Sequence, residues 1–507
     1  MGLNLSVLLT ESAKAYPDRP ALRVGRSVIT YRRLDEESDR AATVLRGLGV
    51  ARGRTVALML PNGVDFVVAC LGVLKAGGTV VPLNTLLRAG ELEFCLHDSG
   101  AHVLIVGEDL GHEALPVAAG LGVPQVLKAT GFLDRVAAAQ PGGPVEDTDP
   151  GDIAVLLYTS GTTGRPKGAQ LTHSGMVWTA HTIATRVLRM TPDDVVLAAL
   201  PFSHIFGLNA VLNMALLSGA CVLIEQRFDA EATLPLMAEH RVSVFPGVPA
   251  MSVGLLAAYR RRPVELPELR VALLGGQSVP TEVRRAFTDT FGCHTIESYG
   301  ISEASSAVAA TPADRPGKPA SVGQPIWGTD VLIADDDGKP CPTGERGEIL
   351  VRGVGVMTGY HNLPEATAEA LRDGWFHTGD IGLLDADGDL FVVDRKKDMI
   401  IRGGYNIYPR EVEEILYQHP DVLEAAVLGV PDPLHGEEVA AAVRLRPGAR
   451  TTADELREYT RDRLAAYKYP RIVAFVDRLP TSSTGKLLKR AIDTHELRRV
   501  ADEQKGQ

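Results

Sequence analysis

The sequence predicts an α/β protein with a large N-terminal domain, built from two α/β sheets plus a β-subdomain, and a small α+β C-terminal domain. Three observations lead to this expectation. Short runs of β-branched residues alternate with amphipathic helical segments up to about residue 320. Turn-rich β-structure follows, and a smaller α+β pattern begins after residue 395. With 507 residues, the chain has room for about three units of the usual ~150 residues.

The first part of the chain alternates predicted strands and helices. Runs rich in β-branched residues predict buried strands at 79–83, 103–106, 195–197, 221–224, 242–245 and 271–274. Amphipathic periodicity predicts helices over 34–48 and 281–291. The second helix follows Val279-Pro280, and proline suits the first turn of a helix. This alternation is typical of α/β folds with largely buried sheets.

Turn signals mark the β-subdomain that follows. They stand at Asp335 to Gly338, Pro342 to Gly344, Asp373-Gly374 and Asp387-Gly388. The C-terminal part then predicts a helix at 409–418, strands at 424–430 and 438–445, a helix at 452–467 and a strand at 471–476. We place the domain boundary in the charge cluster Asp394 to Asp398, so that the domains span 1–395 and 396–507. Taken alone, that cluster is more typical of an ordinary exposed turn.

Composition excludes several classes of function. Lys+Arg 52 against Asp+Glu 63 leave a net charge of −11, which argues against a nucleic-acid or anionic-membrane partner. The longest nearly apolar stretch, 210–224, is too short to cross ~30 Å of hydrocarbon, so no membrane span is expected. Five scattered cysteines without a CxxC pattern suggest neither a disulfide framework nor a zinc site. We therefore expect a cytoplasmic protein.

The segment Tyr158 to Gly168 concentrates hydroxyls, glycines and a lysine in one loop directly after the strand-like run 153–157. Glycines let backbone N–H groups approach phosphate oxygens, hydroxyls add donors, and a lysine adds positive charge. The pattern is not a Walker A sequence, and by composition a flexible surface loop explains it about as well. The candidate phosphate ligands are Thr159, Ser160, Gly161, Thr162, Thr163, Gly164 and Lys167.

This loop resembles the signature phosphate loop of the adenylate-forming enzymes, the superfamily of acyl-CoA synthetases, luciferases and peptide-synthetase adenylation domains. Further motifs follow in the family's order and extend over almost the whole chain. They are Pro201 to His204, Gly275-Gly276, Tyr299 to Glu303, Thr378 to Asp380, Asp394 to Lys397, Gly403 to Asn406 and Pro480 to Lys486. The chain is most similar to the fatty acyl-CoA synthetase type. The resemblance implies ATP, Mg²⁺ and CoA, or the phosphopantetheine of a carrier protein, as cofactors and substrates.

The resemblance assigns roles on the nucleotide side. Glu303 is similar to the carboxylate that holds Mg²⁺ on the ATP phosphates, although alone it would pass for a capping residue at a strand end. Asp380 resembles the carboxylate that accepts both ribose hydroxyls, with Arg395 assisting. Ser302 stands where relatives usually carry threonine and keeps the hydroxyl. The remaining expected nucleotide contacts are Gly275, Gly276, Gln277, Ser298, Tyr299 and Gly300.

The same resemblance implies a mobile C-terminal domain. Lys486 is similar to the lysine that enters the active site during the first half-reaction, and Lys397 matches the hinge position about which the domain swings. Gly403, Gly404 and Tyr405 match the loop that borders the pantetheine tunnel in the second half-reaction. His204 resembles the histidine that gates the acyl pocket, although alone it would more often be a packed core histidine.

The acid is predicted from what the pocket lacks. Ser203 to Phe206 carries no aspartate for a substrate ammonium, and the segment after Gly247-Val248-Pro249 carries no arginine for a second carboxylate. The pocket candidates are apolar or small, namely Phe206, Leu208, Val248, Met251, Gly300, Ala304 and Val308. We expect a fatty monocarboxylic acid, with an aryl acid of the cinnamate type as a competitor.

Several alternatives stay open at this point. CoA and an acyl carrier protein present the same thiol. The resemblance makes CoA the expected acceptor, and a fatty acyl carrier-protein ligase is the alternative that the motifs do not separate from it. An inactive sensor of acyl-AMP is disfavoured because Lys167, Glu303, Asp380, Arg395 and Lys486 are all retained. A light-emitting oxygenase is the other outcome within the superfamily. The expected assembly is a monomer or homodimer.

Overall fold

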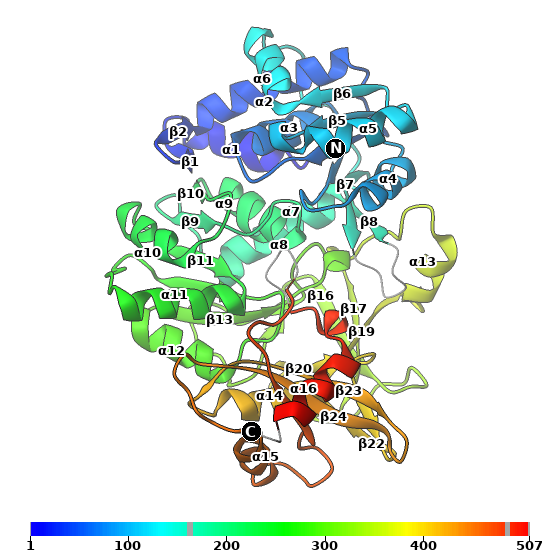
Figure 1. The fold of residues 1–507 in the computed structure, drawn as a ribbon. Coiled ribbons are helices and arrows are strands. Elements are labelled where there is room, and N and C mark those ends of the chain that lie inside the picture. Colours follow the sequence, from blue (N-terminus) through cyan, green and yellow to red (C-terminus); the bar gives the residue numbers. More distant parts are fainter. Residues whose placement is uncertain (1, 160–165, 482–486, 505–507) are drawn as a thin grey trace.

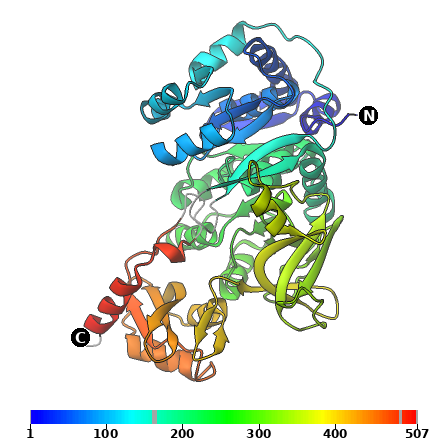
Figure 2. The same cartoon turned by 90° about the vertical axis from the view of Figure 1, so that its right-hand side faces the viewer.

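The computed structural model describes residues 2–159, 166–481 and 487–504. These residues form a large α/β region with two mixed sheets, an antiparallel β-subdomain and a small α+β C-terminal region. Figures 1 and 2 show the C-terminal region at the end of the molecule opposite to the N-terminal sheet. The predicted fold class is confirmed. No helix in the described part of the chain has the length and apolar composition needed to span a bilayer.

The N-terminal sheet has six strands in the order β6-β5-β3-β4-β7-β8, in which only β7 and β8 pair antiparallel. Its strands are β3 Thr55–Met59, β4 Thr79–Pro82, β5 Val103–Val106, β6 Gln125–Lys128, β7 Ile153–Thr159 and β8 Lys167–Thr172. Its helices are α2 Tyr31–Gly47, α3 Val64–Lys75, α4 Ala89–Asp98, α5 Gly111–Leu121 and α6 Ala129–Ala138. The predicted phosphate loop joins β7 to β8.

The second sheet has nine strands in the order β15-β14-β13-β12-β11-β9-β10-β1-β2, and β11, β12 and β13 run parallel. Its strands are β1 Pro20–Val24, β2 Ser27–Thr30, β9 Val195–Ala198, β10 Cys221–Ile224, β11 Val244–Gly247, β12 Val271–Leu274, β13 His294–Tyr299, β14 Ala309–Ala310 and β15 Gln324–Pro325. Its helices are α1 Val7–Ala15, α7 His173–Thr182, α8 Ile205–Gly207, α9 Met214–Leu217, α10 Ala230–Glu239, α11 Pro249–Arg261 and α12 Thr281–Phe291. Two π-helical segments, η2 Ile183–Val187 and η3 Leu208–Asn213, lie among them.

The β-subdomain is an antiparallel sheet in which β20 pairs with β19. Its elements are β16 Thr329–Ala334, β17 Gly347–Gly353, α13 Pro364–Ala370, β18 Leu371–Arg372, β19 Trp375–Leu384 and β20 Leu390–Arg395. The next strand begins at Ile400, so residues 396–399 lead from this sheet into the C-terminal one.

The C-terminal region has its own sheet and core. Two hydrophobic clusters there contain only residues from Ile400 onward. The strands are β21 Ile400–Arg402, β22 Tyr405–Ile407, β23 Val422–Asp432, β24 Gly436–Leu445 and β25 Ile472–Phe475, and the helices are α14 Pro409–Tyr417, α15 Ala453–Arg461 and α16 Thr494–Gln504.

One predicted helix is shorter than expected. The sequence predicts a helix through Tyr467, but α15 ends at Arg461. The backbone continues in turns, with the Leu464 N–H bonded to the Thr460 carbonyl. Tyr467 instead stacks on Tyr405, with ring centroids 4.6 Å apart. A tertiary contact with β22 therefore overrides the helical periodicity.

Candidate functional site

The C-terminal ends of the parallel strands β11, β12 and β13 meet at one edge of the second sheet. The Gly275 N–H donates to the Gly247 carbonyl at 3.1 Å. A Cβ at Gly275 would lie 2.9 Å from Ser298 Oγ and 3.4 Å from Phe206 Cε1, so only glycine fits there without displacing a neighbour. Gly276 has φ +80, a backbone conformation that favours glycine. In open α/β sheets, ligands bind at this edge.

Beside this edge, a hydrogen bond and an ion pair link three side chains from different strands. Tyr299 OH donates to Asp380 Oδ2 at 2.5 Å, and Arg395 Nε lies 3.3 Å from Asp380 Oδ1. The antiparallel β19–β20 register sets Asp380 directly opposite Arg395. Burial, and next the Asp380 charge, raise the pKa of the Tyr299 phenol well above its usual value, so Tyr299 remains a donor at neutral pH. The structure thus brings these three predicted residues together.

A second carboxylate, Glu303, lies in the 3₁₀ turn η4 Ser302–Ala304 that follows β13. Tyr360 OH donates to Glu303 Oε1 at 3.0 Å, and Lys167 Nζ lies 5.0 Å above the Tyr360 ring. Burial first, and Glu303 second, raise the pKa of Tyr360 above its usual value. In the part of the chain that the structure describes, Glu303 has no ion pair within 4.0 Å. Its half-buried carboxylate therefore keeps acceptor capacity for a further ligand.

The loop that carries Glu303 is held by a buried amide. Asn209 of η3 is fully buried, and its Nδ2 donates to the Ser305 carbonyl at 2.8 Å and to the Met176 carbonyl at 3.2 Å. Ser305 and Ser306 have φ 54 and φ 108, which is strained for non-glycine residues. A Cβ at Gly300 would lie 1.5 Å from the Ser306 carbonyl oxygen, so the loop can close only over a glycine.

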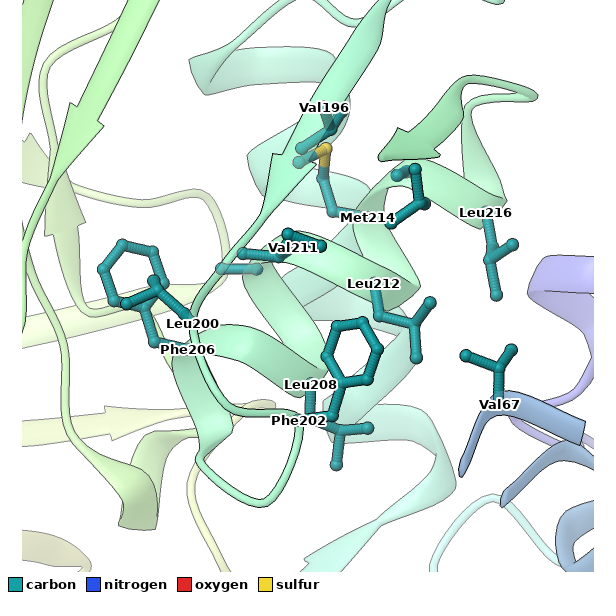
Figure 3. Packing of buried hydrophobic residues seen from close by; sticks show 14 of the residues in the cluster. Val67, Val196, Leu200, Phe202, Phe206, Leu208, Val211, Leu212, Met214 and Leu216 are labelled. Atoms are coloured by element: carbon teal, nitrogen blue, oxygen red, sulfur yellow. The ribbon is translucent and has the colours of Figure 1, made fainter. Parts of the chain in front are cut away.

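The acyl side of the edge is apolar. His204 is half-buried, and its Nδ1 accepts from the Phe206 N–H at 3.3 Å. Figure 3 shows the Phe206 ring on the opposite side of its segment from Phe202, which packs with Leu212 and Val67. A Cβ at Gly276 would meet Val248 Cγ1 at 3.5 Å, which puts Val248 beside Phe206 at this edge. Leu208, by contrast, is packed in the core with Phe202.

The C-terminal region contacts the same edge beside Gly276. The Leu487 N–H donates to Gln277 Oε1 at 3.0 Å. Lys486 itself and Ser160 to Gly164 lie outside the described residues. Partial loss of hydration, followed by the neighbouring Arg395 charge, lowers the pKa of the Lys397 ammonium from its usual value.

Gly403, Gly404 and Tyr405 lie away from the strand edge. All three are exposed, and both glycines have positive φ. The contacts described for the loop lie within the C-terminal region: the Gly403 N–H donates to the His435 carbonyl at 2.8 Å, and Tyr405 stacks on Tyr467. The structure does not bring this predicted loop to Gly275.

Three structural contacts at the site have no counterpart in the sequence prediction. An isolated β-bridge between Tyr360 and Ala169 of β8 holds the Tyr360 backbone, and the Tyr360 hydroxyl bonds Glu303. The bridge joins residues that are far apart in the sequence. Asn209 and the Arg410–Glu297 pair also join residues far apart in the chain. Predicting these contacts from sequence would require an alignment in which the paired positions vary together, and a single sequence cannot show this.

Two described groups of three carboxylates or histidines are close enough to share a cation, and neither includes Glu303. They are Asp432, His435 and Glu438, and Asp385, Asp387 and Asp389. The ammonium of Lys318 lies within 3.0 Å of a carboxylate oxygen of each aspartate in the second group. The guanidinium of Arg402 bonds Glu438 in the first. A protein cation therefore already contacts each group, although Lys318 offsets only part of the charge of the three aspartates.

Comparison with known proteins agrees with this geometry. The model of the AMP-binding enzyme family matches residues 9–361, and that of the AMP-binding enzyme C-terminal domain matches residues 411–486. The chain belongs to the AMP-binding enzyme family. It is an AMP-forming acid–thiol ligase of the acyl-CoA synthetase type.

Its relatives in this family include ligases of several acids. The chain is 42% identical over 480 residues to a feruloyl-CoA synthase of Amycolatopsis sp, which covers 94% of this chain and 96% of the relative. It is 36% identical over 524 residues to a long-chain-fatty-acid–CoA ligase of Bacillus subtilis (strain 168), covering 96% and 94%. Among solved structures, ATP-bound MatB from Rhodopseudomonas palustris matches with TM-score 0.92 and 31% identity over 99% of this chain and 100% of that one.

Proposed function

We propose that this AMP-binding enzyme activates a monocarboxylic acid with an aromatic ring, of the hydroxycinnamate class, and transfers it to CoA. The observation that carries this proposal is the 42% identity to a feruloyl-CoA synthase across nearly the full length of both chains. The expectation of a fatty acid rested on an apolar pocket, and such a pocket accepts an aryl ring as readily as an alkyl chain. The relatives therefore move the preference to the aryl acid.

The acyl side supports an uncharged acyl group. The side chains nearest to Gly275 and Gly276 are Ser298, Phe206 and Val248, none of which carries a charge. A second carboxylate or an ammonium on the acid would be desolvated there without a partner, at a cost of ~1 to 3 kcal/mol or more. The Phe206 ring offers a flat face or edge against which an aromatic ring can pack.

On the nucleotide side, we assign Asp380 to the ribose hydroxyls. Each oxygen of its carboxylate already accepts one protein donor and retains a second lone pair for a hydroxyl. Arg395 and Tyr299 fix the orientation of that carboxylate. We assign adenine to the backbone at Gly275, Gly276 and Gly300, with Gln277 and Ser298 beside it. Thr159, Lys167 and the loop 160–164 take the phosphates.

The residues around Glu303 fit a magnesium ion. Magnesium prefers a carboxylate together with phosphate and water oxygens, and Glu303 is a half-buried carboxylate with spare acceptor capacity. Tyr360 orients it, and Lys167 adds positive charge on the same side. When bound, Mg²⁺ neutralises negative charge on the phosphates. Ser302 places a hydroxyl next to this carboxylate.

The chemistry then needs positioning and electrostatics, and no protein nucleophile. The substrate carboxylate attacks the α-phosphorus of ATP, forming the acyl adenylate while the bond to pyrophosphate breaks. The thiol of CoA next attacks the acyl carbonyl, its proton is lost, and AMP leaves. His204, beside Phe206, borders the acyl group. Lys486 stabilises the charge that develops in the first step, and its neighbour Leu487 already contacts Gln277.

The two steps use different orientations of a C-terminal domain, residues 396–507, against residues 1–395. We place the hinge at Lys397, which lies between the last strand of the β-subdomain and the first strand of the C-terminal sheet. In the second orientation, the exposed loop of Gly403, Gly404 and Tyr405 borders the pantetheine arm.

A long-chain fatty acid is the second candidate. The 36% identity to a long-chain-fatty-acid–CoA ligase, over 96% of this chain, supports it. Phosphopantetheine on a carrier protein presents the same thiol as CoA, so the acceptor is tested in the same experiment.

The experiment incubates the full chain with MgATP and ferulate, cinnamate, benzoate, octanoate, palmitate or malonate, each with CoA or with a phosphopantetheinylated carrier protein. Thioesters are identified by mass. We expect feruloyl-CoA and cinnamoyl-CoA to form fastest and malonyl-CoA to be absent. Faster palmitoyl-CoA formation would favour the second candidate, and carrier-protein product without acyl-CoA would refute the choice of CoA.

Lys486→Ala tests the two-step assignment. It should abolish ATP–pyrophosphate exchange yet leave thioester formation from preformed acyl-AMP largely intact, because the lysine acts only in the first step. Equal loss of both half-reactions would contradict the domain alternation.

A further inference from the structure

One side chain of the C-terminal domain is anchored at several points in the N-terminal domain. Arg410, at the start of α14, donates through Nη2 to Glu297 Oε1 at 3.4 Å and through Nη1 to the Val392 carbonyl. Its backbone N–H donates to Asp394 Oδ2 at 2.9 Å. The side chain is 12% exposed and that of Glu297 only 3%. The pair is therefore almost fully removed from water at the boundary between the domains.

Arg410 is the cation that forms an ion pair with Glu297, while Arg284 acts on the same carboxyl more weakly. Apart from Arg410, it is bonded by the Val279 N–H at 3.1 Å. Burial raises the pKa of the Glu297 carboxyl, and Arg410 is the main opposing influence. A buried carboxylate that loses its cation is strongly destabilised, whereas one that becomes exposed to water is not. An orientation that removes Arg410 must therefore also expose Glu297 or supply another partner.

The pair runs beside the predicted nucleotide contacts. Glu297 and Tyr299 alternate with Ser298 on β13, so both point to the same face of the strand. Tyr299 reaches Asp380 and Arg395, while Glu297 reaches Arg410, whose backbone is bonded to Asp394. Asp394 and Arg395 are adjacent on β20. Two series of side-chain contacts therefore connect β13 to β20, one through Tyr299 and Asp380 and the other through Glu297 and Arg410. One lies at the ribose side and the other extends into the C-terminal domain.

The same orientation brings the segment after Lys486 to the nucleotide side. Leu487 bonds Gln277, and Glu414 of α14 accepts from the Thr281 N–H at 3.4 Å. The loop of Gly403 to Tyr405 is exposed. This is the arrangement expected for adenylate formation and not for thioester formation.

We propose that Arg410 is a positioning residue which, through Glu297, holds the C-terminal domain in the orientation for adenylate formation. This inference rests on the proposed function, because it assigns the contact to one of its two half-reactions. Arg410 touches no reacting atom. In the docked orientation, Arg410 neutralises the buried carboxylate of Glu297. The Arg410–Glu297 ion pair must separate before the C-terminal domain can leave that orientation.

The test compares Arg410→Gln, Glu297→Gln and the double variant in the full-length enzyme, with the two half-reactions measured separately. In Arg410→Gln, the stranded carboxylate should lower ATP–pyrophosphate exchange by about tenfold or more. Thioester formation from preformed acyl-AMP and CoA should stay within about twofold of wild type, since that step uses the other orientation. In the double variant no buried charge is stranded, so exchange should recover by at least about threefold over Arg410→Gln.

A matched control is available in the N-terminal domain. Arg270 pairs with the buried Asp194 at 2.8 Å and also donates to a backbone carbonyl, that of Leu188, but the whole arrangement lies within one domain. Arg270→Gln should lower thermal stability without separating the half-reactions. The proposal is overturned if Arg410→Gln lowers both half-reactions equally, if Arg270→Gln gives the same separation, or if the double variant shows no recovery.

These outcomes differ from a failure of the proposed function. If the wild-type enzyme forms no adenylate with any acid of the panel, the function itself is wrong. If the wild type performs both half-reactions but the Arg410 variants do not separate them, only the positioning role is refuted.

Discussion

The two sides of the site that we assign to the nucleotide and to the acyl group differ in the kind of contact that shapes them. On the nucleotide side, each carboxylate is oriented by a tyrosine: Asp380 by Tyr299 and Glu303 by Tyr360. On the acyl side, Phe206 and Val248 are apolar, and His204 Nδ1 accepts from the Phe206 N–H. Hydrogen bonds form only with ligand groups in a particular geometry. Apolar side chains can pack against different groups of similar volume.

This difference explains how one scaffold serves relatives that act on different acids. ATP is common to the reaction, so its contacts depend on polar groups fixed by several strands. The acid differs, and changes among apolar side chains alter preference without disturbing those polar groups. Substitutions on the nucleotide side should therefore affect all acids alike, and substitutions on the acyl side should affect the ratio between acids.

The largest effect is expected for Asp380→Ala. The ribose hydroxyls lose their acceptor, and Tyr299 and Arg395 lose a buried partner, so adenylate formation should fall by about 100-fold or more. ATP–pyrophosphate exchange measured with ferulate and with octanoate checks this. Both acids should lose the same factor, and a loss confined to one acid would contradict the assignment to the nucleotide side.

Glu303→Gln should have the next largest effect. The amide keeps the size of the side chain and an acceptor for Tyr360 but removes the charge, which should lower adenylate formation by roughly 10 to 100-fold at limiting magnesium. The measurement is exchange activity against Mg²⁺ concentration. The curve should shift to higher Mg²⁺, and an unchanged curve would argue against metal binding by this carboxylate.

Tyr360→Phe isolates the orientation of Glu303 from its charge. Loss of one hydrogen bond to a carboxylate costs about 1 to 2 kcal/mol, so a decrease of roughly 5 to 30-fold is expected. The ring that lies under Lys167 is retained. The Mg²⁺ dependence should shift in the same direction as in Glu303→Gln but by less, and a larger shift than in Glu303→Gln would contradict the order of these roles.

Phe206→Leu should have the smallest overall effect and the sharpest selectivity. Replacing the ring by an alkyl group changes the ratio of kcat/KM for ferulate and octanoate by about 10-fold or less. The KM for ATP should be unchanged. A change in ATP KM without a change in the acid ratio would place Phe206 on the nucleotide side and remove the distinction between the two sides.

Much of the fold is local in origin. The strands and helices around the site follow short-range hydrophobic patterns, so β12 and α12 begin and end within the predicted ranges. The motif residues Tyr299, Asp380 and Arg395 are also predictable, because each lies in a short motif that resembles the family's. Tyr299 and Arg395 end β13 and β20, whereas Asp380 lies within β19. The acid is less predictable from the sequence, because the apolar residues allow fatty and aryl groups alike. The preference for an aryl acid comes from the higher identity to the feruloyl-CoA synthase than to the long-chain-fatty-acid–CoA ligase.

By itself, the sequence determined the α/β class and the family, and it supplied the candidate site residues, since all of these depend on local patterns and motif spacing. Only the tertiary structure decided which of those residues meet. Tyr360 reaches Glu303, Asn209 supports the Glu303 loop, and Arg410 reaches Glu297 across the proposed domain boundary. The physical reason is that burial and charge pairing act between residues distant in the chain, and the folded backbone alone sets those distances.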